Sequence, residues 1–315
     1  MRTDPANVER VAVVGTGVIG SGWAAHFLRQ GLEVMAFDPA PGAEARLQAF
    51  LDDVWPTMIR LGLKSGAGRE RLTFADSVAA AVAGAHFVQE NAPEKAEVKI
   101  EVLAEIDRHA PADCVIASST SGYAMTLLQQ ACAQPERTVV GHPFNPPYLI
   151  PLVEVVGGEK TDPAAVGWAV AFYTHVDKYA LKMSREVPGF VANRVQEALW
   201  REALHMIKEG MATVEEIDAA VTYGPGLRWA IMGPLLTFHL AGGAGGMGHM
   251  LDHFDPGVFE SWTKLKAPPI TPELRQKLVE GCEREADSRS IRQLEQERDA
   301  CLIAIMEALG ECRQL

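Results

Sequence analysis

Cysteine, basic charge and long apolar runs are all scarce in this sequence, and each shortage excludes a class of protein. The five cysteines are scattered through 315 residues and lack the close pairing of disulfide frameworks and metal sites. We therefore expect reduced thiols and no metal ion. No apolar run approaches the length that crosses a bilayer, and residues 1–10 are too polar for a secretion signal. A cytoplasmic protein is expected.

Basic residues are in the minority, since 29 Lys and Arg face 41 Asp and Glu and leave a net charge of −12. A chain of this charge repels phosphate backbones and anionic lipid head groups, so we expect no nucleic-acid partner and no membrane partner. Apolar residues make up 48% of the chain and charged residues 22%, which is the balance of a globular protein. A length of 315 residues exceeds the usual size of one domain and predicts two.

Short apolar runs alternate with helical patterns in the first half of the chain. The expected strands cover residues 10–15, 32–37, 85–88, 114–117, 138–141 and 152–156. The expected helices cover residues 21–30, 43–63 and 94–109, the second of them broken near Pro56. This alternation predicts an α/β domain with a doubly wound (Rossmann), mostly parallel sheet.

Strand signals nearly vanish after residue 188. Helical patterns, with capping residues such as Thr213 and Gly210, cover residues 190–209, 213–221 and 273–309, and residues 241–248 form a glycine-dense loop. We therefore expect two domains, an α/β domain at residues 1–187 and an all-helical domain at residues 188–315.

A glycine fingerprint lies between the first expected strand and the first expected helix, in the segment Gly15-Thr-Gly17-Val18-Ile19-Gly20. The first glycine permits a tight turn, the second lets a pyrophosphate approach the backbone, and the third lets the helix pack on the strand. The N-terminus of the helix then offers free N–H groups to the phosphates. The segment predicts a dinucleotide site.

Asp38 follows the second expected strand, at about the ~20-residue spacing from the fingerprint that places a carboxylate on the adenosine ribose. Its charge would repel a 2′-phosphate, and residues 39–45 contain no Arg or Lys to receive one. We therefore expect NAD rather than NADP as the cofactor.

Four further stretches resemble the 3-hydroxyacyl-CoA dehydrogenase superfamily, and the likeness extends over nearly the whole chain. They are SSTSG at 118–122, GHPFNPP at 141–147, PLVEVV at 151–156 and PGFVANR at 188–194. The resemblance implies that His142 is the catalytic base and Glu154 its partner. It also implies that Ser121, Asn145 and Asn193 line the active site.

The resemblance further implies an acidic residue and a lysine near the nicotinamide ribose, which match Glu90 and Lys95. The segment at residues 224–234 departs from the enzymes that handle CoA, because it carries an arginine, Arg228, and is longer. This segment and residues 238–243 are instead similar to carnitine 3-dehydrogenases. The resemblance thus implies hydride transfer from the 3-hydroxyl of L-carnitine to NAD, giving 3-dehydrocarnitine and NADH.

The chemistry of alcohol oxidation explains why a histidine and a carboxylate are needed. The nicotinamide takes only the hydride, so a base must take the hydroxyl proton. An imidazole has an unperturbed pKa of about 6.5 and can change charge near neutral pH. A carboxylate such as Glu154 fixes its tautomer and stabilises the imidazolium. Ser121 and Asn145 could hydrogen-bond the hydroxyl and the nicotinamide amide, or could be ordinary turn residues.

The two charged ends of carnitine need different partners. Aromatic faces hold a trimethylammonium through cation–π contact. Six aromatic residues are candidates for this role: Phe144, Tyr148, Trp229, Phe238, Phe254 and Trp262. For the carboxylate we expect Arg228, because a guanidinium can form two parallel hydrogen bonds with it.

Three alternatives remain open at this point. A CoA-thioester dehydrogenase would need more bases than Arg46, Arg60 and Lys64 provide in residues 40–65. An L-gulonate 3-dehydrogenase would need polar groups in place of an aromatic box. A non-catalytic, lambda-crystallin-like protein would keep the fold without turnover. The helical second domain on an acidic chain predicts a homodimer.

Overall fold

The chain divides into two compact units, Met1–Arg194 and Val195–Leu315. The computed structural model describes residues 4–253, 263, 271–291, 293, 294, 297, 301, 304, 305, 307 and 308. The domain boundary expected between residues 187 and 188 stays a prediction.

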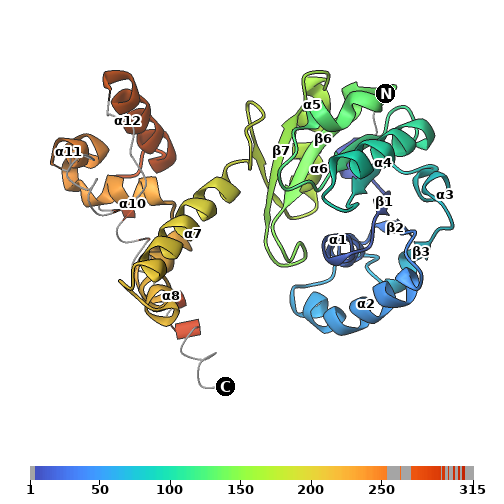
Figure 1. Ribbon diagram of the computed structural model, residues 1–315, viewed down its shortest axis with the longest axis horizontal. Coiled ribbons are helices and arrows are strands. Elements are labelled where there is room, and N and C mark those ends of the chain that lie inside the picture. The colour runs from blue at the N-terminus through green and yellow to red at the C-terminus, as the bar shows by residue number, and fades with distance from the viewer. Residues whose placement is uncertain are drawn as a thin grey trace. The chain divides into compact units, whose positions relative to one another are not determined.

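An eight-stranded sheet forms the centre of the first unit (Figure 1). Its strands lie in the order β3-β2-β1-β4-β5-β6-β7-β8, and every neighbouring pair is parallel except β6 and β7. The strands are β1 Arg10–Val14, β2 Glu33–Phe37, β3 Leu72–Phe74, β4 Phe87–Glu90, β5 Val115–Ser118, β6 Thr138–Pro143, β7 Leu152–Gly157 and β8 Tyr179–Lys182. The predicted doubly wound, mostly parallel sheet is confirmed; β3 and β8 are additional to the predicted strands.

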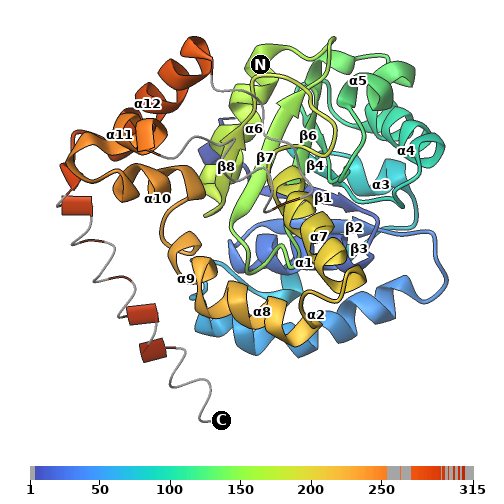
Figure 2. The ribbon, with the colours of Figure 1, turned by 60° about the vertical axis from the view of Figure 1, so that its left-hand side comes forward.

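Helices cover both faces of this sheet. One face packs against α1 (Val18–Arg29), α2 (Ala43–Arg60) and α6 (Pro163–His175). The other packs against α3 (Val78–Val82), α4 (Ala96–His109) and α5 (Met125–Leu128), which gather on one side of the strands in Figure 2. Successive strand residues point to opposite faces, so Val11 and Val13 join the first core while Ala12 and Val14 join the second. Burial on both faces explains the continuous apolar runs.

Helix α2 does not break near Pro56, so that expectation is wrong. The helix continues from Ala43 to Arg60 with the proline inside it. Proline removes one N–H donor and crowds the preceding turn. The buried residues Leu47, Leu51, Val54 and Met58 lie on both sides of it, and their burial outweighs the missing hydrogen bond.

The second unit is helical, as predicted, and no described residue after β8 lies in a strand. Its helices are α7 Ala192–Lys208, whose first turn lies in the first unit, α8 Val214–Tyr223, α9 Pro225–Trp229, α10 Pro234–Ala241, α11 Gly246–His253 and α12 Pro272–Ala286. A capping box at Thr213 starts α8, and Gly210 has a φ of +68°.

Short 3-10 helices complete both units. They lie at Pro5–Asn7, Arg69–Arg71, Gln129–Ala131, Pro135–Arg137 and Gly243–Gly245. Within the described residues, no helix has the length and hydropathy of a bilayer span.

Two expectations for the second unit need correction. The glycine-dense segment at 241–248 is largely helical rather than a loop, because glycine lets α10 and α11 pack closely. A side chain at Gly246 would lie 2.7 Å from the imidazole of His239. The helical pattern at 273–309 is interrupted, since α12 ends at Ala286, where Asp287 and Ser288 have positive φ angles. Parts of that pattern lie outside the described residues.

Candidate active site

The glycine fingerprint forms the turn between β1 and α1. Gly15 has a φ of +88°, and a Cβ there would lie 2.6 Å from the carbonyl oxygen of Asn91. A Cβ at Gly20 would overlap the carbonyl oxygen of Gly15. Gly17 differs, because a Cβ there would have no heavy atom within 4 Å. The first and third glycines are thus required by the fold, whereas the second leaves open space beside the backbone.

This open space lies at the N-terminus of α1, which suits a dinucleotide phosphate. No side chain caps the helix at Gly17, and Val18 is 70% exposed. The first-turn N–H groups and the positive end of the helix dipole therefore face a site that an anion can enter.

Asp38 lies at the end of β2 and holds the same turn. Its Oδ2 accepts a hydrogen bond from the Thr16 amide at 2.8 Å, and its Oδ1 accepts one from the Ala40 amide at 2.9 Å. The carboxylate is half-buried, and each oxygen keeps a further lone pair. Asp38 can therefore fix the glycine turn and still accept a hydrogen bond from a ribose hydroxyl.

His142 and Glu154 face each other across the antiparallel pair β6 and β7. The imidazole Nδ1 lies 3.0 Å from Glu154 Oε2, and the two residues are 4% and 0% exposed. The strand expected at residues 138–141 continues through His142 to Pro143, so the imidazole belongs to a residue of the sheet rather than to the loop beyond it. An ionised carboxylate accepts the Nδ1–H and leaves Nε2 as the ring nitrogen that can take a proton.

The second oxygen of Glu154 also has partners. Glu154 Oε1 accepts hydrogen bonds from the amides of Val191 at 2.8 Å and Ala192 at 2.9 Å. Burial alone would raise the pKa of Glu154, but the hydrogen bonds from His142 and the two amides outweigh it and lower this pKa. The carboxylate is therefore held ionised, as a partner of an imidazolium must be.

Two phenylalanines flank the imidazole. The Phe144 ring centroid lies 5.4 Å from that of His142, edge to face, and the Phe190 centroid lies at 5.1 Å. Phe190 is 1% exposed and has a φ of +53°. Phe144 is among the aromatic residues expected to line the site, whereas Phe190 is not, although it lies in the family-like stretch at 188–194; its approach to His142 depends on the backbone turn after Gly189.

Ser121 lies on the exposed loop that follows β5, and its backbone is fixed from two sides. Asn193 Nδ2 donates to the Ser121 carbonyl oxygen at 3.0 Å. Glu94 Oε1 accepts hydrogen bonds from the amides of Ser121 and Gly122 and from the Thr120 hydroxyl. The structure thus joins Ser121 and Asn193, two of the expected residues, and adds Glu94, which no sequence signal identified.

Glu90 lies fully buried at the end of β4 and pairs with Lys99, a residue that the resemblance does not name. Lys99 Nζ lies 3.0 Å from Glu90 Oε1, and the lysine is 1% exposed. Lys95 is instead exposed at the N-cap of α4. A signal for Lys99 does exist, because it shares a helical stripe with the buried Leu103 and Ile106.

The remaining expected residues lie on the loop after β6 or in the second unit. Asn145 is exposed on the loop after β6, and Tyr148 packs on Phe50 at a ring distance of 6.0 Å. Arg228 and Trp229 lie on α9 and Phe238 on α10, all three exposed. Phe254 and Trp262 lie outside the described residues.

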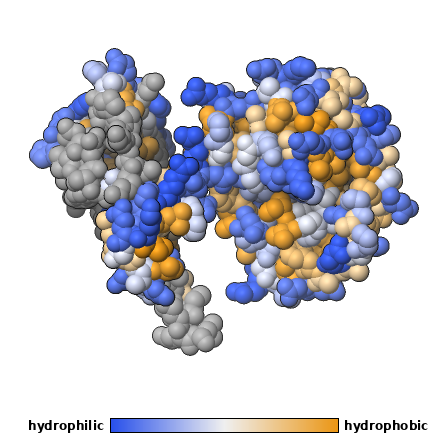
Figure 3. Space-filling view, in the orientation of Figure 1, coloured by the Kyte–Doolittle hydropathy of each residue, from blue (hydrophilic) through white to orange (hydrophobic). Residues whose placement is uncertain are grey.

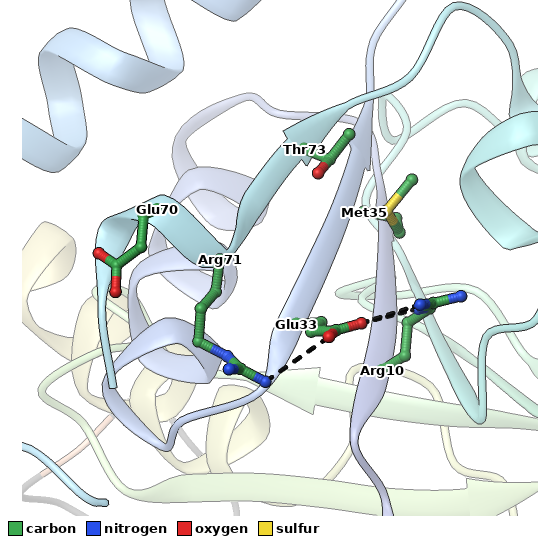
Figure 4. Close-up of a pocket in the computed structure, with 6 residues that line it drawn as sticks. All are labelled: Arg10, Glu33, Met35, Glu70, Arg71 and Thr73. Carbon is green, nitrogen blue, oxygen red and sulfur yellow. Dashed lines mark hydrogen bonds and ion pairs between the residues drawn. The ribbon is translucent and has the colours of Figure 1, made fainter. Parts of the chain in front are cut away.

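A separate pocket of about 360 Å³ lies beside β1, β2 and β3, near their amino ends (Figure 4). Arg10 and Arg71 converge there on Glu33, with shortest distances of 2.9 Å and 3.8 Å. Glu33 thus balances part of the positive charge of the two arginines. Parallel sheets bind ligands at the carboxyl ends of their strands, so we place the active site at the other edge.

Two family descriptions match the chain. Residues 10–187 match the NAD binding domain of 3-hydroxyacyl-CoA dehydrogenase, and residues 189–279 match its C-terminal domain. Among curated proteins, the L-carnitine dehydrogenase of Streptomyces coelicolor is 59% identical over 98% of this chain and 97% of its own length. That of Bacillus cereus is 51% identical over 96% and 93%. These matches confirm the resemblance and the expected cofactor.

Solved structures of related dehydrogenases have a similar fold. A 5-formyl-3-hydroxy-2-methylpyridine 4-carboxylic acid 5-dehydrogenase, described as an NAD+ dependent dismutase, has a TM-score of 0.71 and 30% identity and covers 96% of this chain and 99% of its own. The 3-hydroxybutyryl-CoA dehydrogenase of Escherichia coli has a TM-score of 0.64 and 27% identity, over 87% of this chain and 57% of its own. The chain belongs to the 3-hydroxyacyl-CoA dehydrogenase family.

Proposed function

We propose that this protein oxidises the 3-hydroxyl of L-carnitine with NAD, giving 3-dehydrocarnitine and NADH. The observation that carries the proposal is the buried His142–Glu154 pair, whose Nε2 is left to accept a proton. The pair lies near the carboxyl end of β6, and the glycine turn follows the carboxyl end of β1 in the same parallel run of strands. Near-full-length relatives named L-carnitine dehydrogenase support the choice of substrate.

The bound NAD supplies the acceptor for the hydride that leaves the 3-carbon. His142 Nε2 takes the hydroxyl proton as the C–O bond becomes a carbonyl. Glu154 holds Nδ1–H and stabilises the positive charge that the imidazole acquires. Ser121 and Asn145 hydrogen-bond the hydroxyl and the nicotinamide amide, and Asn193 holds the Ser121 loop.

The two ends of the substrate are assigned from chemistry. Phe144, beside His142, offers an aromatic face to the trimethylammonium, with Trp229 and Phe238 as sequence-based candidates for the same role. Arg228 is our candidate for the carboxylate. Glu90 and Lys95 remain candidates for the nicotinamide ribose, and Lys99, buried and bonded to Glu90 and to the Ala92 carbonyl oxygen, orients the Glu90 carboxylate.

Absorbance of NADH tests the proposal directly. The purified protein and NAD are mixed separately with L-carnitine, D-carnitine, L-gulonate and 3-hydroxybutyryl-CoA. We expect NADH with L-carnitine at a kcat/KM at least about tenfold above that of the other three, a difference of about 1.4 kcal/mol in transition-state binding. A preference for L-gulonate or the CoA thioester would reassign the substrate. No increase in NADH absorbance with any of the four compounds would favour a non-catalytic homologue.

Replacing Gly17 with alanine should separate cofactor binding from folding. A Cβ at Gly17 meets no protein atom, so we expect an unchanged Tm but an NAD affinity at least about tenfold weaker, because the methyl group occupies the approach of the pyrophosphate. Gly20→Ala is the matched control, since its Cβ overlaps Gly15 and should lower the Tm. Calorimetry measures the Tm, and titration with NAD measures the affinity. An unchanged NAD affinity in Gly17→Ala would remove Gly17 from the site.

We also propose a homodimer formed through α7 and α8. Neither helix has a buried residue, and apolar side chains gather on this part of the surface (Figure 3). The exposed apolar residues of α7 include Val195, Leu199, Trp200, Leu204 and Ile207. An uncovered amphipathic face of this kind is typical of an interface. Sedimentation equilibrium should give twice the chain mass of 34.1 kDa; a mass of one chain at micromolar concentration would exclude the dimer.

A further inference from the structure

Lys178 is a buried lysine to which the proposed reaction assigns no role. It lies between α6 and β8, and the residue is 6% exposed. Its backbone amide donates to the Tyr173 carbonyl oxygen at 2.9 Å, which fixes where its side chain starts. A buried ammonium is costly unless its protons find acceptors, so its partners indicate what it does.

The ammonium of Lys178 contacts backbone oxygens and an aromatic face. Nζ donates to the carbonyl oxygen of Pro147 and, at 3.1 Å, to that of Ile150. Nζ also lies 5.3 Å from the ring centroid of Trp23 on α1. The neighbouring Asp177 is not its counter-ion, because that carboxylate bonds Gln30 and Lys64 instead. Charge-assisted bonds from one ammonium thus converge on two peptide groups of a single loop.

This loop, residues 144–150, joins the two strands of the catalytic pair. It starts after β6, which carries His142, and ends before β7, which carries Glu154. It contains Phe144 and Asn145. Inside the loop, the amides of Leu149 and Ile150 both donate to the Pro146 carbonyl oxygen at 3.0 Å.

Helix α1 contacts the loop from another direction. A Cβ at Gly22 would lie 2.7 Å from Cδ of Pro147, so the proline ring lies directly against the helix backbone. Trp23, the next residue, is fully buried under the ammonium of Lys178. The loop is therefore held against α1 by contact and tied to the turn before β8 by Lys178.

We infer that Lys178 is a positioning residue, which ties the loop at residues 144–150 to the core and so sets the places of Phe144 and Asn145. The inference rests on the proposed function for the roles of those two residues. The ammonium of Lys178 contacts the Pro147 and Ile150 carbonyl oxygens and the Trp23 ring, so it acts through the loop. Its removal leaves two carbonyl oxygens without their donor and frees the loop to shift, and a shift of about 1 Å in a positioning group can lower a rate about 10²-fold.

The charge of Lys178 makes its contact with the loop at residues 144–150 dependent on pH. Burial, assisted by the positive charge of Arg29, lowers the pKa of Lys178 to about 8. The other titratable groups around it are His26 on α1, Asp177 with its partner Lys64, and Tyr148 in the loop. Burial and the charge of Lys178 lower the pKa of His26, so His26 stays neutral near pH 8. Above this pH the neutral amine of Lys178 bonds the carbonyl oxygens more weakly.

Lys178→Met tests the inference, with Lys64→Met as the matched control. Lys64 is half-exposed and pairs with Asp177, so its loss removes a nearby positive charge without touching the loop. In the cofactor-free protein, we expect the amides of Leu149 and Ile150 to exchange hydrogen at least tenfold faster in Lys178→Met and unchanged in Lys64→Met. With NAD and L-carnitine, we expect kcat to fall 10- to 100-fold in Lys178→Met and to stay within twofold of the wild type in Lys64→Met. The wild-type kcat should also decline above about pH 8, and the variant should lack this decline.

The exchange measurement separates the two proposals, because it needs no substrate. If exchange is faster in Lys178→Met but the wild type does not oxidise L-carnitine, the proposed function is overturned, while the inference that Lys178 holds the loop at residues 144–150 stands. Unchanged exchange at Leu149 and Ile150 in Lys178→Met would overturn the tie, as would an equal fall of kcat in Lys64→Met. Should Lys178→Met fail to fold, Gly22→Ala perturbs the same loop through Pro147 and should give the same faster exchange; unchanged exchange there would overturn the inference.

Discussion

His142→Asn is expected to lower kcat for L-carnitine oxidation about 10²- to 10⁴-fold, because the variant has no group in place of Nε2 to accept the hydroxyl proton. The asparagine amide can still donate to Glu154 Oε2, so the buried carboxylate keeps a partner and the fold should be retained. Steady-state kinetics measures the loss. NAD affinity should stay within about twofold, since a change in the proton acceptor leaves the cofactor site intact.

A second variant tests the partner of the base. Glu154→Gln should lower kcat by a similar factor with little change in Tm, because its amide oxygen can still accept from Val191 and Ala192. A His142→Asn enzyme with wild-type kcat would exclude His142 as the base.

Arg137→Met is expected to lower the free energy of unfolding by about 3–5 kcal/mol, because it leaves a buried carboxylate without its charged partner. Arg137 is 1% exposed and Asp107 3%, with Nη2 and Oδ1 2.9 Å apart. The guanidinium also donates to the backbone carbonyl oxygens of Asp107, Ala110 and Pro111. Asp107 Oδ2 in turn accepts from the amides of Ala133 and Gln134. Urea unfolding measures the change.

Arg10→Met provides the matched control for the buried pair. Arg10 and Glu33 lie 2.9 Å apart, but their side chains are 44% and 43% exposed. Exposed ion pairs contribute about 0–1 kcal/mol, so the control should be much less destabilising. Equal losses in Arg137→Met and Arg10→Met would show that burial does not set the value of the Arg137–Asp107 pair.

Much of the first unit follows from local sequence. The strands that bury both faces, such as β1 and β5, are continuous apolar runs, and the turn at Gly15 leaves only glycine as a suitable residue. β3 and β8 escape prediction because they lie at the sheet edges, where they are three and four residues long and only partly apolar. The unbroken helix α2 and the helix within residues 241–253 depend on packing against other elements, which local propensity does not contain.

The candidate site also contains residues that the sequence predicts and residues that only the structure reveals. Motifs predict His142, Glu154, Ser121 and Asn193, and the geometry pairs them as 142 with 154 and 121 with 193. Glu94 and Lys178 carry no local signature, and the stretch at 188–194 does not indicate that Phe190 lies against His142, because each of these three residues contacts residues far along the chain.

The sequence by itself determined the class of the sheet, the glycine turn and the choice of NAD, since these depend on residue type and short-range spacing, while its family motifs nominate His142 and Glu154 as the proton-accepting pair. Only the tertiary structure decided that β6 and β7 run antiparallel with His142 opposite Glu154, that Lys99 pairs with Glu90, and that Lys178 reaches the loop between β6 and β7. These contacts join segments distant in sequence, and the burial of apolar surface that brings such segments together is non-directional until the whole core is packed.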